Sequence, residues 1–230
     1  MKHGATRTLF EYWDEIRATR SAPERGDIQP SAIKTVLGDT FILEVRQPAN
    51  FRYRLAGTRL CSIHCRELKG RDFLSPWSHQ DREAMLSMLA TVTQDAAASV
   101  VGITCRNDQG HTLDMEMLLL PVKVRGEGCT RILGCAVPMQ RPYWLGVHPI
   151  VSQSITGLRL IWPDEDIMYK DEPLEVYHIG RPQSQSARRP LRSQPQLGSS
   201  LLKPKLPPLP QGASVVARAP HLRIIQGGRS

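Results

Sequence analysis

Residues 51–73 constrain the fold more than any other stretch of this 230-residue chain. The segment opens with Phe51-Arg52-Tyr53-Arg54-Leu55, where apolar and basic residues alternate as they do in a strand with one buried face. Gly57 then interrupts the alternation, Thr58 can cap a short helix, and Gly70 can end the following turn with a positive φ. The pattern predicts a strand, a short helix and a glycine-ended turn in succession.

The elements on either side can be read in the same way. Apolar residues at helical spacing predict an amphipathic helix over residues 7–20 and a longer helix over 78–94. Alternating apolar residues predict further strands, with a hairpin turn at 107–110, over residues 40–46, 99–106, 111–121 and 130–138. The expected fold class is α+β: a five-stranded antiparallel sheet with helices on one face, behind an N-terminal amphipathic helix.

The segment also resembles a known family. Residues 51–58 read FRYRLAGT and residues 64–70 read HCRELKG, which is similar to a bacterial single-domain PAS family whose members read roughly FRYRLAGT…GRELTG. In the second segment, the residues before Arg66 match the family less closely than the rest. The resemblance spans about residues 7–163. It implies a PAS-like sheet and a sensory or protein-interaction role, and it names no reaction.

The resemblance also implies where a ligand would bind. PAS domains that hold ligands do so between the inner sheet face and the helices. The residues expected to line such a pocket, which a plain packed core would use equally well, are Phe41, Tyr53, Leu55, Met88, Val101, Ile103, Met115 and Met117. On the leading helix, Trp13 and Phe10 are the candidates for a dimer or partner contact, because aromatic residues dominate such interfaces.

Several cysteines and histidines could in principle support metal, redox or cofactor chemistry. Cys61 and Cys65 would share a helical face, but a zinc site needs a second pair of ligands, so no metal is predicted. A redox role would require that a neighbouring arginine lower the pKa of one of these thiols. His64 and His79 are poor candidates for a haem ligand, and the residues around Cys61 do not reproduce a flavin-linking motif. Neither haem nor flavin is predicted.

Catalytic motifs are not apparent in the sequence. The chain contains no Gly-x-Ser-x-Gly elbow, phosphate-binding glycine loop or His-Glu-x-x-His pair. Asp114 and Glu116 share one face of a strand, and we interpret them as the outer face of an amphipathic strand. The expectation is that the protein is not an enzyme.

Charge is distributed unevenly along the chain. Residues 1–169 hold 20 Lys and Arg against 19 Asp and Glu, whereas residues 170–230 hold 10 against 3. Because the excess positive charge lies in the tail, nucleic-acid binding by the folded part is not expected. The expected organisation is a helical flank (1–25), a PAS-like domain (26–140), an apolar extension packing on the domain or a partner (141–169), and a disordered basic Pro-rich tail (170–230).

The sequence as a whole favours a cytoplasmic signalling module. It shows neither a secretory signal nor an apolar run long enough to span a bilayer. Such a module would act in trans on other signalling proteins, with scope for a homodimer and a small-molecule ligand. The alternative is a small ligand-binding or enzymatic α+β domain whose basic tail tethers it to nucleic acid or membrane.

Overall fold

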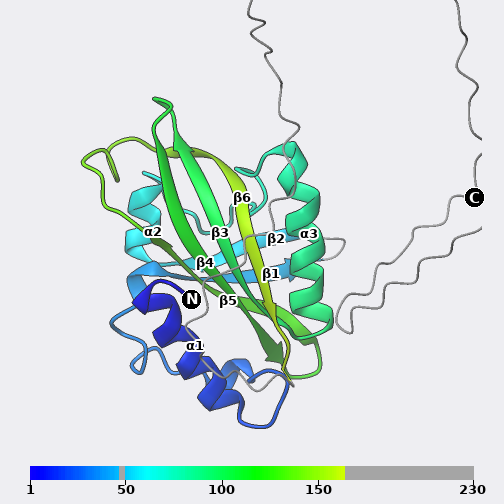
Figure 1. The fold of residues 1–230 in the computed structure, drawn as a ribbon. Coiled ribbons are helices and arrows are strands. Elements are labelled where there is room, and N and C mark those ends of the chain that lie inside the picture. The colour runs from blue at the N-terminus through cyan, green and yellow to red at the C-terminus, as the bar shows by residue number, and fades with distance from the viewer. Residues whose placement is uncertain (47–49, 164–230) are drawn as a thin grey trace, which may run out of the picture. The chain divides into compact units, whose positions relative to one another are not determined.

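The computed structural model describes residues 1–46 and 50–163, and the predicted disordered tail lies outside this part of the chain (Figure 1). Within the described residues, three α-helices and two single-turn 3-10 helices accompany the strands. The helical elements are α1 (Gly4–Arg17), η1 (Arg25–Asp27), η2 (Leu37–Asp39), α2 (Thr58–Ile63) and α3 (His79–Gln94). The strands are β1 (Thr40–Arg46), β2 (Asn50–Ala56), β3 (Ala98–Asn107), β4 (Thr112–Val124), β5 (Gly128–Pro138) and β6 (Ile150–Ile161).

The strands form one antiparallel sheet in the order β2-β1-β5-β4-β3-β6. Five of them confirm the expected antiparallel sheet, but the expected number of strands was wrong because β6 adds a sixth. This strand pairs along β3 from Ile150 to Ile161, so it covers the backbone groups of an edge that would otherwise be open. Residues 150–161 of the apolar extension expected at 141–169 are therefore a strand of the same sheet.

The two faces of the sheet bury separate hydrophobic clusters. Residues of α2 and α3 pack with alternate residues of the strands, such as Val101 and Met117, in the cluster that we call the helix-face core. The remaining strand positions, such as Val100 and Leu118, pack with α1 on the opposite face. The sheet is thus covered on both sides, α1 taking one face and α2 and α3 the other.

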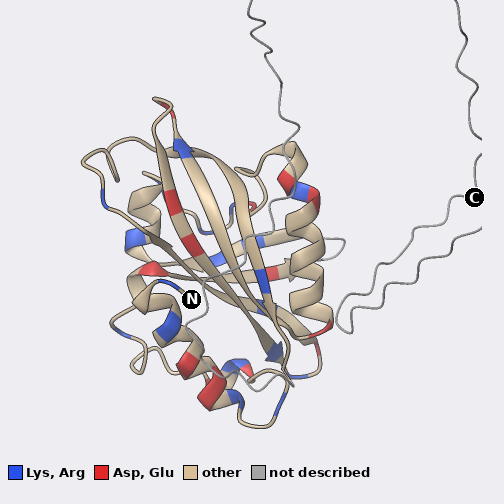
Figure 2. Ribbon diagram, in the orientation of Figure 1, with Lys and Arg blue, Asp and Glu red and all other residues tan. Residues whose placement is uncertain are grey.

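Helix α1 is held on its face of the sheet by its apolar stripe. Leu9, Phe10 and Trp13 are buried against the strands, and the Trp13 indole Nε1 donates a hydrogen bond to the Pro121 carbonyl at 2.9 Å. Figure 2 shows charged positions along α1, of which Glu11 and Glu15 are exposed to solvent. Phe10 and Trp13, expected to be available for a dimer contact, are instead used within the chain itself. An amphipathic stripe does not reveal which surface it covers, and here that surface is the chain's own sheet.

No helix in the described ranges, 1–46 and 50–163, is long and apolar enough to cross a membrane.

Candidate functional site

Aromatic rings occupy the centre of the helix-face core. Phe41, Tyr53 and Phe73 contact one another, with ring centroids 5.6–6.0 Å apart, and Trp77 extends the group with a centroid 6.1 Å from that of Phe73. All four side chains are buried. Such a ring cluster combines a large buried apolar area with edge-to-face contacts, so it stabilises the packing between sheet and helices.

The structure brings seven of the eight pocket candidates together. Val101 and Ile103 of β3 lie directly opposite Met117 and Met115 of β4, and Met88 reaches the same cluster from α3. Phe41 and Tyr53 join them from β1 and β2. Whether these side chains contact a ligand stays a prediction, because the same contacts make a packed core.

Leu55 does not belong to this group. Its side chain is 50% exposed, and the register of β1 and β2 shifts between Ile42 and Leu43. The shift places one extra residue in β2, so the alternation that buries Phe51 and Tyr53 reverses before Leu55. Ala56 packs against the helix-face core in its place.

Polar groups are also buried in or beside the helix-face core. His64 is buried after the end of α2, and desolvation lowers the pKa of its imidazole to about 4, with the nearby Arg66 acting in the same direction. Burial likewise raises the pKa of the Tyr53 hydroxyl above its usual range. The Trp77 indole Nε1 is buried and has no acceptor in the described part of the chain. Sequence reasoning passed over Trp77 because no local motif marks an indole as buried and unpartnered.

The cysteines next to α2 do not form the arrangement considered from sequence. Helix α2 ends at Ile63, and Cys65 lies beyond it with a φ of 49°, so Cys61 and Cys65 do not share a helical face. Cys61 is half-buried, and desolvation raises the pKa of its thiol. This shift is opposite to the one that a reactive thiolate needs.

Glu116 is placed differently from the expectation for an exposed strand face. Its carboxylate is buried and accepts hydrogen bonds from the backbone N–H groups of Lys2 (2.7 Å) and His3 (3.0 Å) and from the Thr6 hydroxyl. A carboxylate at this position satisfies N–H groups at the start of α1 and complements the helix dipole. Glu116 therefore fastens α1 to the sheet, while its strand neighbour Asp114 bonds to Thr104 at 2.6 Å in a more exposed setting.

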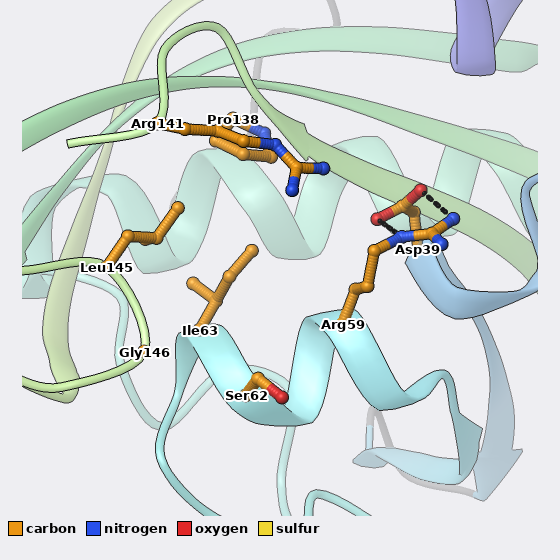
Figure 3. A pocket seen from close by; sticks show the side chains of 8 residues that line it. All are labelled: Asp39, Arg59, Ser62, Ile63, Pro138, Arg141, Leu145 and Gly146. Carbon is orange, nitrogen blue, oxygen red and sulfur yellow. Dashed lines mark hydrogen bonds and ion pairs between the residues drawn. The ribbon is translucent and has the colours of Figure 1, made fainter. Parts of the chain in front are cut away.

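A hollow of about 150 Å3 opens beside α2 (Figure 3). It lies between α2, Asp39 of η2, the end of β5 and the 139–149 loop that leads to β6. Its apolar wall is formed by Ile63, Pro138 and Leu145, and its polar groups include Arg59 and Arg141. No local sequence pattern indicates this hollow, because its residues come from three separate stretches of the chain.

Close backbone packing fixes α2 at the edge of this hollow. A Cβ on Gly57 would collide with the carbonyl oxygens of Leu37 and Gly38, so only glycine permits this approach of η2 and the start of α2. The Gly57 N–H also donates to the Thr40 carbonyl at 2.7 Å. Arg59, the second residue of α2, is thereby brought to Asp39, which it binds through Nε at 2.8 Å and a terminal nitrogen at 2.6 Å.

Comparisons with known proteins agree with this architecture. The family model described as "PAS domain" matches residues 1–137, which is more than half of the sequence. The chain therefore belongs to the PAS domain family, a class of sensory domain. No curated protein matches the sequence.

Solved structures similar to this chain include light-oxygen-voltage (LOV) domains. A LOV domain studied with a flavin analogue is 15% identical, with 49% of this chain and 85% of that chain covered and a TM-score of 0.39. The Rhodobacter sphaeroides LOV protein is 11% identical, with 50% and 71% covered and a TM-score of 0.38. The LOV domain of a blue-light activated histidine kinase from Erythrobacter litoralis is 14% identical, with 44% and 95% covered and a TM-score of 0.36. The family assignment rests on the family model alone.

Proposed function

We propose that this PAS domain is a sensory and protein-interaction module that acts in trans on other signalling proteins of a bacterial pathway. Its helix-face core would take up a small molecule, and the resulting repacking of α2, α3 and the 139–149 loop would alter the surface offered to the partner. Family membership supports the sensory role. The interaction role is supported by the large exposed side chains of the 139–149 loop, such as Tyr143.

The uptake of a small molecule rests on one observation, the buried Trp77 indole N–H without an acceptor. An unpaired buried donor costs about 1–3 kcal/mol, so native structures rarely keep one without a use. A ligand with an oxygen or nitrogen acceptor would remove this cost. The apolar part of the ligand would contact the Phe73 ring and the methionines of β4. Thioether side chains adapt to irregular shapes, so they suit this role.

Native mass spectrometry of the full chain purified from its own host tests this proposal. We expect the wild-type protein to carry a small-molecule adduct and to copurify with a signalling protein. The Trp77→Phe variant keeps an aromatic ring but lacks the donor, so it should lose the adduct. Trp13→Phe, which alters a buried tryptophan on the opposite face of the sheet, should retain it. A wild-type protein without any adduct would contradict the uptake of a ligand.

A further inference from the structure

The hollow beside α2 contains one more positive charge than its carboxylate neutralises. The two hydrogen bonds from Arg59 make Asp39 part of a closed ion pair, and Arg59 also donates to the Thr35 carbonyl at 3.1 Å. Arg141 has neither a hydrogen-bond partner nor an ion-pair partner within residues 1–46 and 50–163. Its guanidinium extends over the hollow from the 139–149 loop (Figure 3). The site is therefore suited to a single negative charge.

The loop that supplies Arg141 also carries exposed apolar side chains. Tyr143 is 87% exposed and Val147 is 67% exposed, and both belong to the loop that supplies Arg141, Leu145 and Gly146 to the hollow. Large exposed apolar side chains are unusual when they gather on one surface, and they then indicate an interaction site. Met139 of the same loop is 39% exposed, and Leu37, which is 36% exposed, belongs to η2, the element that supplies Asp39 to the hollow.

The loop that carries these side chains is anchored. Trp144 is buried in the helix-face core, and its ring stacks on His111 with centroids 5.7 Å apart. Its carbonyl accepts hydrogen bonds from the N–H groups of Val147 (3.0 Å) and His148 (3.1 Å). Tyr143 and Val147 are thus presented on either side of a fixed residue, so a partner would pay little ordering entropy to bind them.

We propose that this hollow is the docking site for an aspartate or glutamate side chain of a partner protein, carried by a segment whose neighbouring apolar residues pack on Tyr143 and Val147. The inference deepens the proposed trans action and rests on it. A volume of about 150 Å3 equals that of about five waters at ~30 Å3 each, which is enough for a carboxylate and its methylene groups. Ser62 of α2 and Gly146 of the loop also line the hollow, and Ile63 and Leu145 would shield the ion pair from water.

A peptide segment fits this surface better than a free small anion does. A small carboxylate would use Arg141 but leave Tyr143 and Val147 exposed to water. Tyrosine and arginine are enriched among the residues that dominate binding energy at protein interfaces, where surrounding contacts of little energetic weight exclude water from them. An arginine without a partner in the described part of the chain and an exposed tyrosine, both carried by one loop, match that composition.

Selection of a phage-displayed library of short random peptides on the full chain tests the proposal. We expect the selected peptides to share an acidic residue flanked by apolar residues. In fluorescence polarisation, Arg141→Glu should weaken their binding by about tenfold or more, since the ion pair becomes a like-charge contact. Changing the shared acidic residue to its amide should weaken binding similarly, and added salt should weaken it further.

Arg125→Glu is the matched control. Arg125 is exposed in the β4–β5 turn, at the opposite end of β5 from Pro138, and one strand of this length places it roughly 30 Å from the hollow. It should leave peptide affinity unchanged. Selection of no acidic peptides, or peptide affinity that Arg141→Glu does not alter, would overturn the inference. So would Arg141-dependent binding of glutarate without any peptide binding, which would identify a free small anion as the ligand.

These outcomes can be separated from failure of the proposed function. A chain that copurifies with a signalling protein equally well in the wild type and in Arg141→Glu still acts in trans, but through another surface. A chain that copurifies with no signalling protein loses the trans role itself.

Discussion

At the scale of single residues, buried His64 links the stability of the fold to pH. Its pKa is lowered to about 4 in the folded protein from the usual 6.5, so the unfolded chain binds a proton that the folded chain does not between these values. The stability due to neutral His64 is therefore fully present above about pH 6.5 and is lost as the pH falls toward 4, by up to ~3 kcal/mol.

Melting temperature measured from pH 7 to pH 4 checks this expectation. His64→Gln should flatten the decline relative to the wild type, because the substituted side chain takes up no proton. His79→Gln removes an exposed histidine at the start of α3 and should leave the decline as steep as in the wild type. Equal slopes in all three proteins would show that His64 does not titrate as its burial requires.

Gly134 is a second residue at which a small change in the side chain is expected to affect stability. It lies directly across from Phe41, and the phenyl ring occupies the space where a Cβ would be. Gly134→Ala should destabilise the protein by about 1–3 kcal/mol, measured by urea denaturation, because the ring must leave its position in the aromatic cluster. Gly157→Ala adds the same methyl group where nothing lies within 4 Å, and it should change stability by less than about 0.5 kcal/mol. Similar losses in both variants would contradict this account.

At the scale of elements, a substitution at Glu116 is expected to loosen α1 from the sheet without disturbing the rest of the fold. Glu116→Gln replaces one acceptor oxygen by an NH2 group that faces the donors of Lys2, His3 and Thr6. The expected cost is about 1–3 kcal/mol, and it should fall selectively on α1. Hydrogen exchange should show faster exchange in α1 and unchanged protection in β3 and β4. Asp114→Asn, two residues away on the same strand, is the control and should leave α1 protected.

Most elements could be predicted from sequence because they depend on local patterns. The hairpin from β3 to β4 and the helix α3 follow alternation, helical spacing and turn residues, and their ends fall close to the predicted ones. The exposure of Leu55 could not be predicted from sequence. The bulge changes the face to which Leu55 points, but the alternating apolar and basic residues look the same with or without it. The burial of Glu116 depends on a helix that begins more than 100 positions away. The apolar content of β6 predicted a packed segment. It did not predict pairing with β3, because the strand order is a property of the whole sheet.

At the scale of the whole molecule, the PAS sheet is enclosed by two independent layers. The layer formed by α1 depends on Trp13 and Glu116, while α2, α3 and the 139–149 loop surround the aromatic cluster and the hollow. The separation allows the helix face to repack without releasing α1. A signal would then pass from the surroundings of Trp77 to the loop that carries Trp144 and Arg141, because both tryptophans belong to the helix-face core.

The most direct measurement is quantitative affinity capture with the full chain from cells of its own host. Wild type, Arg141→Glu and Arg125→Glu are compared, and the captured proteins are identified by mass spectrometry. The account predicts that the wild type and Arg125→Glu enrich the same signalling protein and that Arg141→Glu loses it. The absence of any signalling protein from all three captures would contradict the account.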